Sequence, residues 1–319
     1  MTKIAKRILL IGGNRYKESA PCTTFVKLCK QYGIQVKIIS DKTRSQYLDQ
    51  DDVSLEDFAA NEKIEFQLIN HISEAKLEKH ANDNDLIIMS MNNHSIFSRS
   101  IVNMFDQRIF NYHNATLPLY RGAGAHSWRL MAGSLATNLT IHRIAEKVDT
   151  GEIICELNVK FDPEINNLED TYKKIREHEE DLFIKFLSQK INIKEQSEHD
   201  SYYWPMLNTA KNGFIDWYFN AKEIKSFCAA FDKPYEGAKT FLGKSTVYFS
   251  NVELANDDFK FHPYQRGLIY RINNNGTFVA TIEGGILVKS IVIEGDDTLR
   301  VGKRFITPQS IIESSLITV

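Results

Sequence analysis

Arg7-Ile-Leu-Leu-Ile-Gly12 is a continuous apolar run that ends in the pair Gly12-Gly13. A strand covered by helices on both faces of a parallel sheet has this pattern, because neither face meets water. Strand-like and helix-like segments alternate after it. A helix is expected at 23–32, and strands are expected at 36–39, 86–90 and 109–113. This alternation predicts an α/β fold whose N-terminal domain is a Rossmann-like, open and mostly parallel sheet.

The glycine pair invites a dinucleotide-binding interpretation, which the sequence does not favour. That fingerprint needs a third glycine at a fixed offset, and Gly12-Gly-Asn-Arg-Tyr-Lys17 lacks it. A tight turn between the first strand and the helix after it is the favoured use of these glycines.

The second half of the chain has a different pattern of expected elements, with short β-rich runs in place of alternating strands and helices. Apolar residues recur at helical spacing over 168–187, and Asn167 followed by Asp170 is typical of a helix start, so we expect an amphipathic helix packed on the sheet. A helix is expected at 221–231, and turn signals then separate short β-rich runs at 246–249, 267–272, 277–282 and 286–293. Such spacing predicts a small antiparallel domain, either barrel-like or a sandwich.

Length and composition limit the class of protein. With 319 residues the chain exceeds one typical domain of about 100–200 residues, and we divide it into domains at 1–195 and 214–319 with a linker at 196–213. The net charge of −2 argues against a nucleic acid as the main partner. No apolar run approaches the length of about 20 residues that spans a bilayer, so we expect a cytoplasmic protein without a membrane partner. The four cysteines lack metal or redox spacing and are expected to be free.

Two polar clusters carry the candidate chemistry. The first, Asn111-Tyr-His-Asn-Ala-Thr-Leu-Pro-Leu-Tyr-Arg-Gly122, lies at and beyond the carboxyl end of an expected buried strand, where ligands of α/β sheets bind. Asn111 and His113 are two residues apart, so in a strand their side chains point to the same side. The second cluster spans 140–151 and includes His142 and Asp149-Thr-Gly151, yet chain order alone does not place Asp149 beside His113. Taken singly, each of these residues also suits a purely structural role in a turn.

Together the two clusters resemble the formyltransferase family that uses 10-formyltetrahydrofolate. That family includes glycinamide ribonucleotide transformylase, methionyl-tRNA formyltransferase and the nucleotide-sugar N-formyltransferases. Its signature is Asn-x-His followed by Leu-Pro and Arg-Gly, then Thr-x-His, then Asp-Thr-Gly seven residues past that second histidine. Pro118 and Gly122 stand at the expected offsets from His113, and Asp149 stands seven residues past His142. A looser similarity extends the resemblance to about residues 80–310.

The resemblance implies that Asn111, His113 and Asp149 are catalytic. Formyl transfer is the attack of an amine on a carbonyl carbon, and it needs a donor aimed at the oxygen that becomes negative. Asn111 can provide that donor with its amide, and His113 can exchange a proton near neutral pH. A carboxylate at Asp149 would orient the imidazole and favour its protonated form. No metal is required.

The binding residues are also expectations from the resemblance. The folate would be held largely by backbone groups of one strand end and of the loop before Asp149, at Met89, Ser90, Met91, His142, Glu146, Lys147 and Val148. The acceptor would lie against Tyr120, Arg121 and Gly122. The partners implied are therefore 10-formyltetrahydrofolate as formyl donor and an amine-bearing acceptor.

The residues after the candidate catalytic histidine bear on which molecule accepts the formyl group. Asn114-Ala115 follows the candidate catalytic histidine, where the tRNA and purine enzymes commonly carry Pro-Ser, and this is more like the nucleotide-sugar branch. We therefore expect N-formylation of a nucleotide-linked, dTDP-type amino-dideoxy sugar for surface-glycan or O-antigen synthesis. The alternatives are a methionyl-tRNA formyltransferase, a deformylating hydrolase with the same trio, and a non-enzymatic folate or nucleotide binder. An exposed sheet edge at 286–293 would suit a homodimer.

Overall fold

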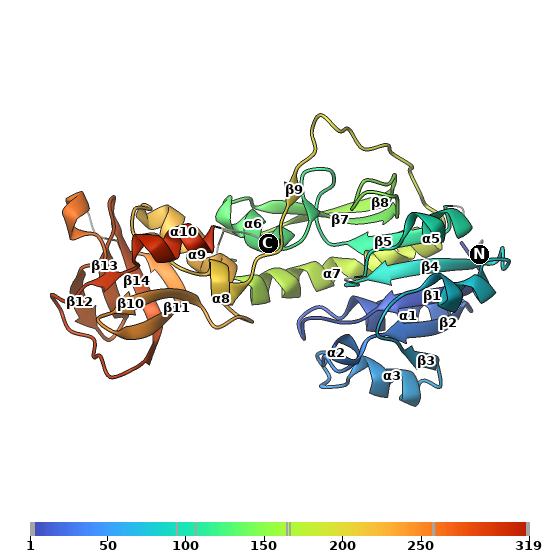
Figure 1. The fold of residues 1–319 in the computed structure, drawn as a ribbon, viewed down its shortest axis with the longest axis horizontal. Helices are drawn as coiled ribbons and strands as arrows, with labels where there is room; N and C mark the ends of the chain where they lie inside the picture. Colours follow the sequence, from blue (N-terminus) through green and yellow to red (C-terminus); the bar gives the residue numbers. More distant parts are fainter. Residues whose placement is uncertain are drawn as a thin grey trace. The chain divides into compact units, whose positions relative to one another are not determined.

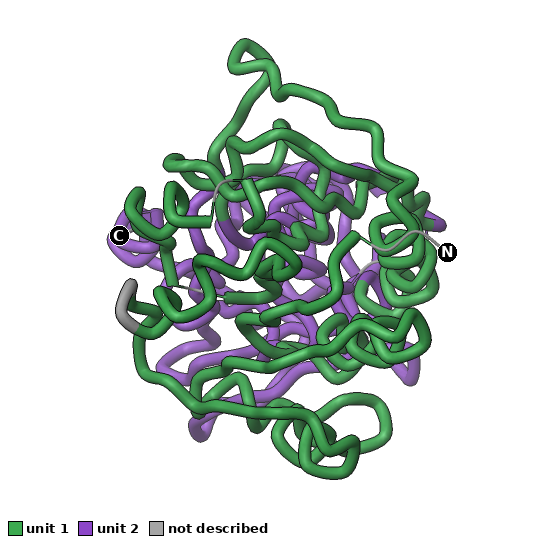
Figure 2. Tube along the Cα trace, turned by 90° about the vertical axis from the view of Figure 1, so that its right-hand side faces the viewer, with its two compact units in different colours: residues 1–122, 136–161, 172–203 green, residues 123–135, 162–171, 204–319 purple. Residues whose placement is uncertain are grey.

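The computed structural model describes residues 4–93, 95–105, 107–163, 165, 167–256 and 259–316 (Figure 1). The chain forms two compact units, coloured separately in Figure 2. Unit 1 comprises Met1–Gly122, Ala136–Phe161 and Tyr172–Tyr203, and unit 2 comprises Ala123–Leu135, Asp162–Thr171 and Trp204–Val319. Two short segments from the expected N-terminal domain, 123–135 and 162–171, thus belong with the β-rich part, and the segment expected as a linker is shared between the units.

Unit 1 is built on a seven-stranded sheet in the order β3-β2-β1-β4-β5-β7-β8. The five strands from β3 to β5 are parallel, whereas β7 and β8 run antiparallel to their neighbours. The strands are β1 (Arg7–Gly12), β2 (Gln35–Ser40), β3 (Glu65–Leu68), β4 (Leu86–Met91), β5 (Ile109–His113), β7 (Ala136–Arg143) and β8 (Ile153–Lys160). The predicted Rossmann-like, mostly parallel sheet is confirmed.

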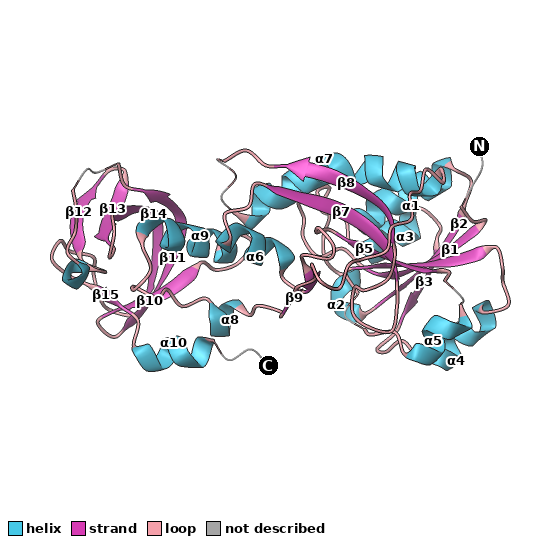
Figure 3. Cartoon of the chain, turned by 90° about the horizontal axis from the view of Figure 1, so that it is seen from above, coloured by secondary structure: helices cyan, strands magenta, loops and turns pink. Residues whose placement is uncertain are grey.

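Helices cover both faces of this sheet, which explains the uninterrupted apolar runs of its central strands (Figure 3). On one face, Phe183 and Phe186 pack edge-on against Tyr112 and Phe110 of β5. On the other face, α5 buries its apolar side against β1, β4 and the start of β5. The helices of this part of the chain are α1 (Pro21–Gln31), α2 (Lys42–Ser45), α3 (Leu55–Asn61), α4 (Glu74–Leu77), η1 (Glu78–His80), α5 (Arg99–Met104) and α7 (Leu168–Leu187).

The long helix α7 begins and ends where its sequence pattern predicts. Asn167 accepts a hydrogen bond from the backbone N–H of Asp170 at 2.8 Å, which satisfies a free donor of the first turn.

The first strand ends at Gly12 because the chain there approaches β4 closely. The φ of Gly12 is +136°, and a Cβ on this residue would lie 1.8 Å from the carbonyl oxygen of Met91. Gly12 is therefore explained by its positive φ and by this close approach to β4, rather than by the tight turn that the sequence suggested.

Unit 2 is organised around a six-stranded antiparallel sheet in the order β12-β13-β14-β11-β10-β15. Its strands are β10 (Ala238–Leu242), β11 (Ser245–Leu254), β12 (Ile269–Asn273), β13 (Gly276–Ala280), β14 (Gly285–Glu294) and β15 (Phe305–Ile306). The backbone N–H of Phe305 donates to the carbonyl of Gly267 at 2.8 Å, and Leu268 bridges Arg304. The two end strands therefore meet, and the sheet curls into the predicted barrel-like form.

One expectation for unit 2 was wrong in part. Residues 286–293 were expected to form an exposed sheet edge, yet β14 lies inside the sheet, paired with β11 on one side and β13 on the other. β13 pairs with Gly285–Val288 of β14, so a free edge is excluded for 286–288, whereas 290–293 are paired through β11. The remaining elements are β6 (Arg121–Gly122), α6 (Ala125–Met131), β9 (Tyr203–Trp204), α8 (Thr209–Asn212), α9 (Ala221–Phe231), η2 (Pro263–Gln265) and α10 (Gln309–Ser315).

Two further observations concern the class of protein. The four cysteines are buried and free of disulfides. Among the residues that the structure describes, no helix combines the length and the apolar character needed to cross a bilayer.

Candidate active site

The last residues of β5 present the first two candidate groups. Asn111 and His113 alternate with Tyr112 along the strand, so their side chains share the face opposite that of Tyr112. The Nε2 of His113 donates to the carbonyl oxygen of Tyr120 at 2.6 Å. This bond fixes the imidazole against the loop that follows the strand, and it leaves Nδ1 facing the next candidate group.

Asp149 completes the cluster from a distant part of the sequence. Its Oδ2 accepts a hydrogen bond from the backbone N–H of Gly122 at 2.9 Å and lies 3.8 Å from Nδ1 of His113. Its Oδ1 lies 3.4 Å from Nε2 of His142. The backbone of Asp149 is left-handed, with φ of +54°, a conformation that aspartate tolerates better than most residues. The fold thus brings the three candidate catalytic residues together, although Asp149 is far from the other two in sequence.

His142 connects Asn111 to Asp149. It lies on β7 directly opposite Asn111 and is 1% exposed. Its Nδ1 donates to the carbonyl oxygen of Arg143 at 2.7 Å, and its Nε2 lies 3.2 Å from the amide nitrogen of Asn111. A neutral His142 therefore accepts from the Asn111 amide, whereas a protonated His142 donates towards Asp149. The prediction that His142 binds folate remains a prediction, since these contacts are all within the protein.

The surroundings of Asp149 favour its charged form. Burial opposes ionisation of the carboxyl, but the charge of His113, the hydrogen bond and charge of His142 and the Gly122 amide together outweigh it. The pKa of Asp149 is consequently well below that of a free aspartate. A carboxylate that stays ionised is suited to stabilising a protonated imidazole next to it.

The opposite face of β5 is fixed by a second buried carboxyl. The hydroxyl of Tyr112 donates to Oε1 of Glu179 at 2.9 Å, and the hydroxyl of Ser19 donates to the same oxygen at 2.8 Å. Burial raises the pKa of Glu179 to about 7, although these two hydrogen bonds oppose the shift. Tyr112 therefore ties the strand that carries Asn111 and His113 to helix α7.

The loop after β5 is held by backbone pairing and by a buried arginine. The N–H of Arg121 donates to Tyr202 O and the N–H of Tyr202 donates to Pro118 O, both at 3.1 Å. Arg121, a predicted acceptor-binding residue, is 5% exposed, and its guanidinium donates to Gln196 and Glu198. Its Nη2 is buried without a hydrogen-bond partner among the described residues. The role of the loop in acceptor binding stays a prediction.

The predicted folate-binding residues occupy two different environments. Met89, Ser90 and Met91 lie inside the sheet on β4, and each is at most 3% exposed. By contrast, Glu146, Lys147 and Val148 are exposed on the loop that leads to Asp149. Only the loop residues have side chains open to a ligand, and no contact within the described structure tests either assignment.

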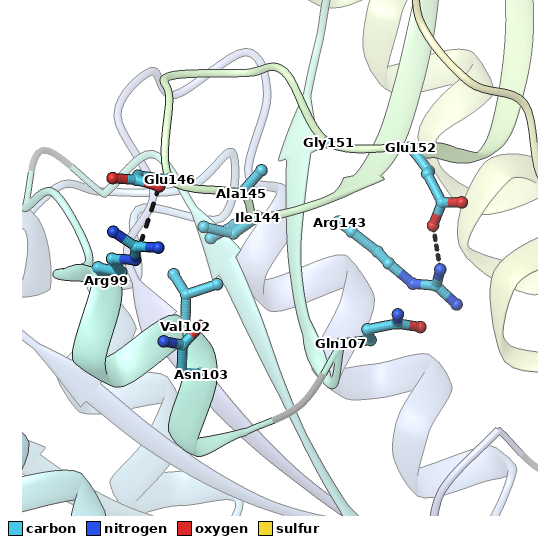
Figure 4. A pocket seen from close by; sticks show the side chains of 10 residues that line it. All are labelled: Arg99, Val102, Asn103, Gln107, Arg143, Ile144, Ala145, Glu146, Gly151 and Glu152. Atoms are coloured by element: carbon cyan, nitrogen blue, oxygen red, sulfur yellow. Dashed lines mark hydrogen bonds and ion pairs between the residues drawn. The ribbon is translucent and has the colours of Figure 1, made fainter.

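A cavity of about 320 Å³ lies beside this loop (Figure 4). Helix α5 forms one wall through Arg99, Val102 and Asn103, and the loop forms another from Ile144 to Glu146. Arg99 and Glu146 approach to 3.8 Å at the mouth, and Arg143 forms an ion pair with Glu152. Apolar and charged groups thus line one pocket that is partly open to solvent.

Gln196 is a residue of the site that the sequence did not predict. This residue falls in the segment expected as a linker, and its Nε2 donates to the carbonyls of both Asp149 and Gly151. An isolated glutamine in a polar stretch carries no local signal for such a contact. Among the described residues, no group of three or more histidine, cysteine or acidic side chains is placed to hold a metal ion.

Replacing Asp149 should destabilise the protein in a pH-dependent way. A depressed folded-state pKa means that the carboxylate contributes stability above its unfolded pKa of about 3.9, and that this contribution is lost as the pH falls towards the lower folded-state value. In urea unfolding, Asp149→Asn should therefore lose more free energy of unfolding at about pH 5 than at about pH 3. Asp296→Asn, at an exposed position of unit 2, is the matched control. An equal loss at both pH values would contradict the pairing of Asp149 with the two histidines.

The chain matches known proteins over both units. Residues 17–187 match the formyl transferase family and residues 208–306 match the formyl transferase C-terminal domain. The methionyl-tRNA formyltransferase of Thermotoga neapolitana is 27% identical over 243 residues, which are 74% of each chain. The matches to five further relatives span between 28% and 71% of their lengths.

Solved structures share the fold. An N-formyltransferase from Helicobacter canadensis, in complex with folinic acid and dTDP-3-aminofucose, has a TM-score of 0.68 at 20% identity, covering 89% of this chain and 99% of that chain. The sugar 3N-formyl transferase WlaRD, in the presence of dTDP and 5-N-formyl-THF, has a TM-score of 0.67 at 20% identity, covering 92% and 98%. With both domains matched in order, the chain belongs to the formyl transferase family and is a folate-dependent enzyme of formyl transfer.

Proposed function

We propose that this enzyme moves a formyl group from 10-formyltetrahydrofolate to the amine of a nucleotide-linked, dTDP-type amino-dideoxy sugar that is used in surface-glycan synthesis. The main support for this reaction is the cluster in which Asp149 contacts His113, His142 and the Gly122 amide. A cytoplasmic location and a homodimer are proposed with it, as the expectations from the sequence.

The residues around the end of β5 suit amine attack on a formyl carbon. In this step the amine nitrogen bonds to the formyl carbon, the bond from that carbon to the folate N10 breaks, and one amine proton ends on N10. While His142 is neutral, Asn111 directs one amide hydrogen to it, and the second is available to the oxygen that gains negative charge. His113 accepts and returns the proton at Nδ1, because its Nε2 hydrogen is donated to Tyr120, and the Asp149 carboxylate stabilises the imidazolium in between.

The cavity beside α5 supports a binding site for the ring system of the folate. A volume of about 320 Å³ is near the lower limit of ligand pockets, so it fits a bicyclic ring better than a whole folate. Ala145 and Glu146 line it and belong to the loop that carries Asp149. None of Asn111, His113 and Asp149 lines this pocket, so the formyl-bearing part of a folate bound there would have to extend out of it towards Asp149.

Three observations support a sugar nucleotide as the acceptor. Asn114 follows His113 as in the nucleotide-sugar branch. The structural likeness to two sugar formyltransferases extends over nearly the whole of both chains. Residues 204–319 carry 13 basic and 12 acidic side chains, without the basic excess that a tRNA-binding face requires. The curated relatives named methionyl-tRNA formyltransferase keep tRNA as the second candidate acceptor.

Incubation with 10-formyltetrahydrofolate and a panel of acceptors tests this proposal. We expect the purified enzyme to formylate at least one dTDP- or UDP-linked amino sugar, with little turnover of initiator methionyl-tRNA. Product mass and release of tetrahydrofolate measure the transfer independently of each other. Turnover of the tRNA alone would contradict the sugar assignment and leave formyl transfer intact.

Filling the cavity should weaken folate binding selectively. Val102→Phe adds a ring to the wall formed by α5, so we expect the Kd for 5-formyltetrahydrofolate to rise by about tenfold or more through steric exclusion. Val292→Phe makes the same change on an exposed position of β14, where 57% of the valine is accessible, and should leave this Kd unchanged. Calorimetric titration measures both variants. Equal affinities would show that the cavity does not hold the folate.

A further inference from the structure

The side chain of Gln196 contacts the backbone of the active site. The side-chain Nε2 of Gln196 donates to the carbonyl oxygen of Asp149 at 2.9 Å and to that of Gly151 at 2.6 Å. Its Oε1 accepts from Nε of Arg121 at 3.1 Å. One amide therefore uses both donor hydrogens and one acceptor position on groups that belong to the site.

These contacts close a ring of hydrogen bonds. Arg121 donates to Gln196, Gln196 donates to the carbonyl of Asp149, and the carboxylate of Asp149 accepts from Gly122, the residue bonded to Arg121. Hydrogen bonds thus hold both the side chain and the backbone of Asp149. A ring of this kind restrains each member more than separate bonds would, because moving one member breaks bonds on both sides.

The turn that carries Asp149 needs such a restraint. Asp149 has a left-handed φ of +54°, which costs free energy for a residue other than glycine. Gly151 packs so closely on the end of β7 that a Cβ would lie 2.0 Å from the carbonyl oxygen of Arg143. The turn also directs two carbonyl oxygens towards one point, and Gln196 supplies the two N–H groups that satisfy them there.

Arg121 provides a rigid anchor for Gln196. The Arg121 side chain is 6% exposed, so its guanidinium has little freedom to move. Glu198 also bonds to it, but the Glu198 side chain is 72% exposed, and such a pair contributes little because water screens it. The anchor therefore acts mainly through the bond from Arg121 to Gln196.

We propose that Gln196, anchored by Arg121, is a positioning residue that holds Asp149 against His113 and the Gly122 amide during formyl transfer. The inference rests on the proposed role of Asp149 in the reaction. It assigns a function to the segment after α7 that goes beyond linking two domains, since this segment supplies a side chain that supports the catalytic carboxylate. It does not depend on the identity of the acceptor.

The test uses Gln196→Met, which keeps the size of the side chain and removes its hydrogen bonds. With whichever acceptor the wild-type enzyme uses, kcat should fall between about 10-fold and 100-fold, because a small displacement of a catalytic group has a cost of this order. The KM for folate and for acceptor should stay within about twofold, since the hydrogen bonds of Gln196 all go to groups of the protein. Gln35→Met makes the same substitution at an exposed position at the start of β2 and should match the wild type in both constants.

A second measurement needs no acceptor. The N–H of Gly122 donates to Asp149, so its hydrogen exchange, resolved by NMR, reports whether the carboxylate stays in place. Gln196→Met should lower the protection of this amide by about tenfold, while Gln35→Met should not.

The outcomes distinguish the two proposals. If the wild type formylates none of the acceptors but the exchange result holds, the proposed function fails and the positioning role stands. Unchanged kcat and unchanged protection in Gln196→Met, or a change in KM alone, would overturn the positioning role whatever the acceptor.

Discussion

The ionised carboxylate of Asp149 is the constraint on which the active site depends. A charge so nearly buried is costly unless hydrogen bonds and opposite charges surround it. The partners come from separate parts of unit 1: His113 ends β5, His142 lies on β7, Gly122 belongs to the loop after β5, and Gln196 follows α7. Because these segments meet only in the folded sheet, the site exists only when the sheet, the loop and the segment after α7 are all in place.

The sequence predicted those parts of the fold that local patterns determine. The strand at 109–113 and the helices at 168–187 and 221–231 have the observed bounds, because apolar periodicity and capping residues act over a few neighbours. The interior position of β14 could not be predicted in this way. It depends on pairing with β11 and β13, which strand patterns alone do not specify.

The same distinction applies to the site. Asn111 and His113 follow from strand alternation beside a polar loop, so their common orientation could be predicted from the residues themselves. Asp149 could be assigned only through the family resemblance, since nothing local places it beside His113. Gln196 could not be found at all, because its partners are backbone carbonyls whose positions are set by the left-handed turn at Asp149.

A double-mutant cycle on kcat tests the central claim that His113 and Asp149 act as one proton-handling unit. Each of His113→Asn and Asp149→Asn should lower kcat by about 10²-fold to 10⁴-fold, the usual range for acid–base catalysis, while circular dichroism shows that the fold persists. If the two residues act together, the double variant should be hardly slower than the slower single variant. Near-normal kcat in either single variant, or two losses that multiply in the double variant, would contradict the account.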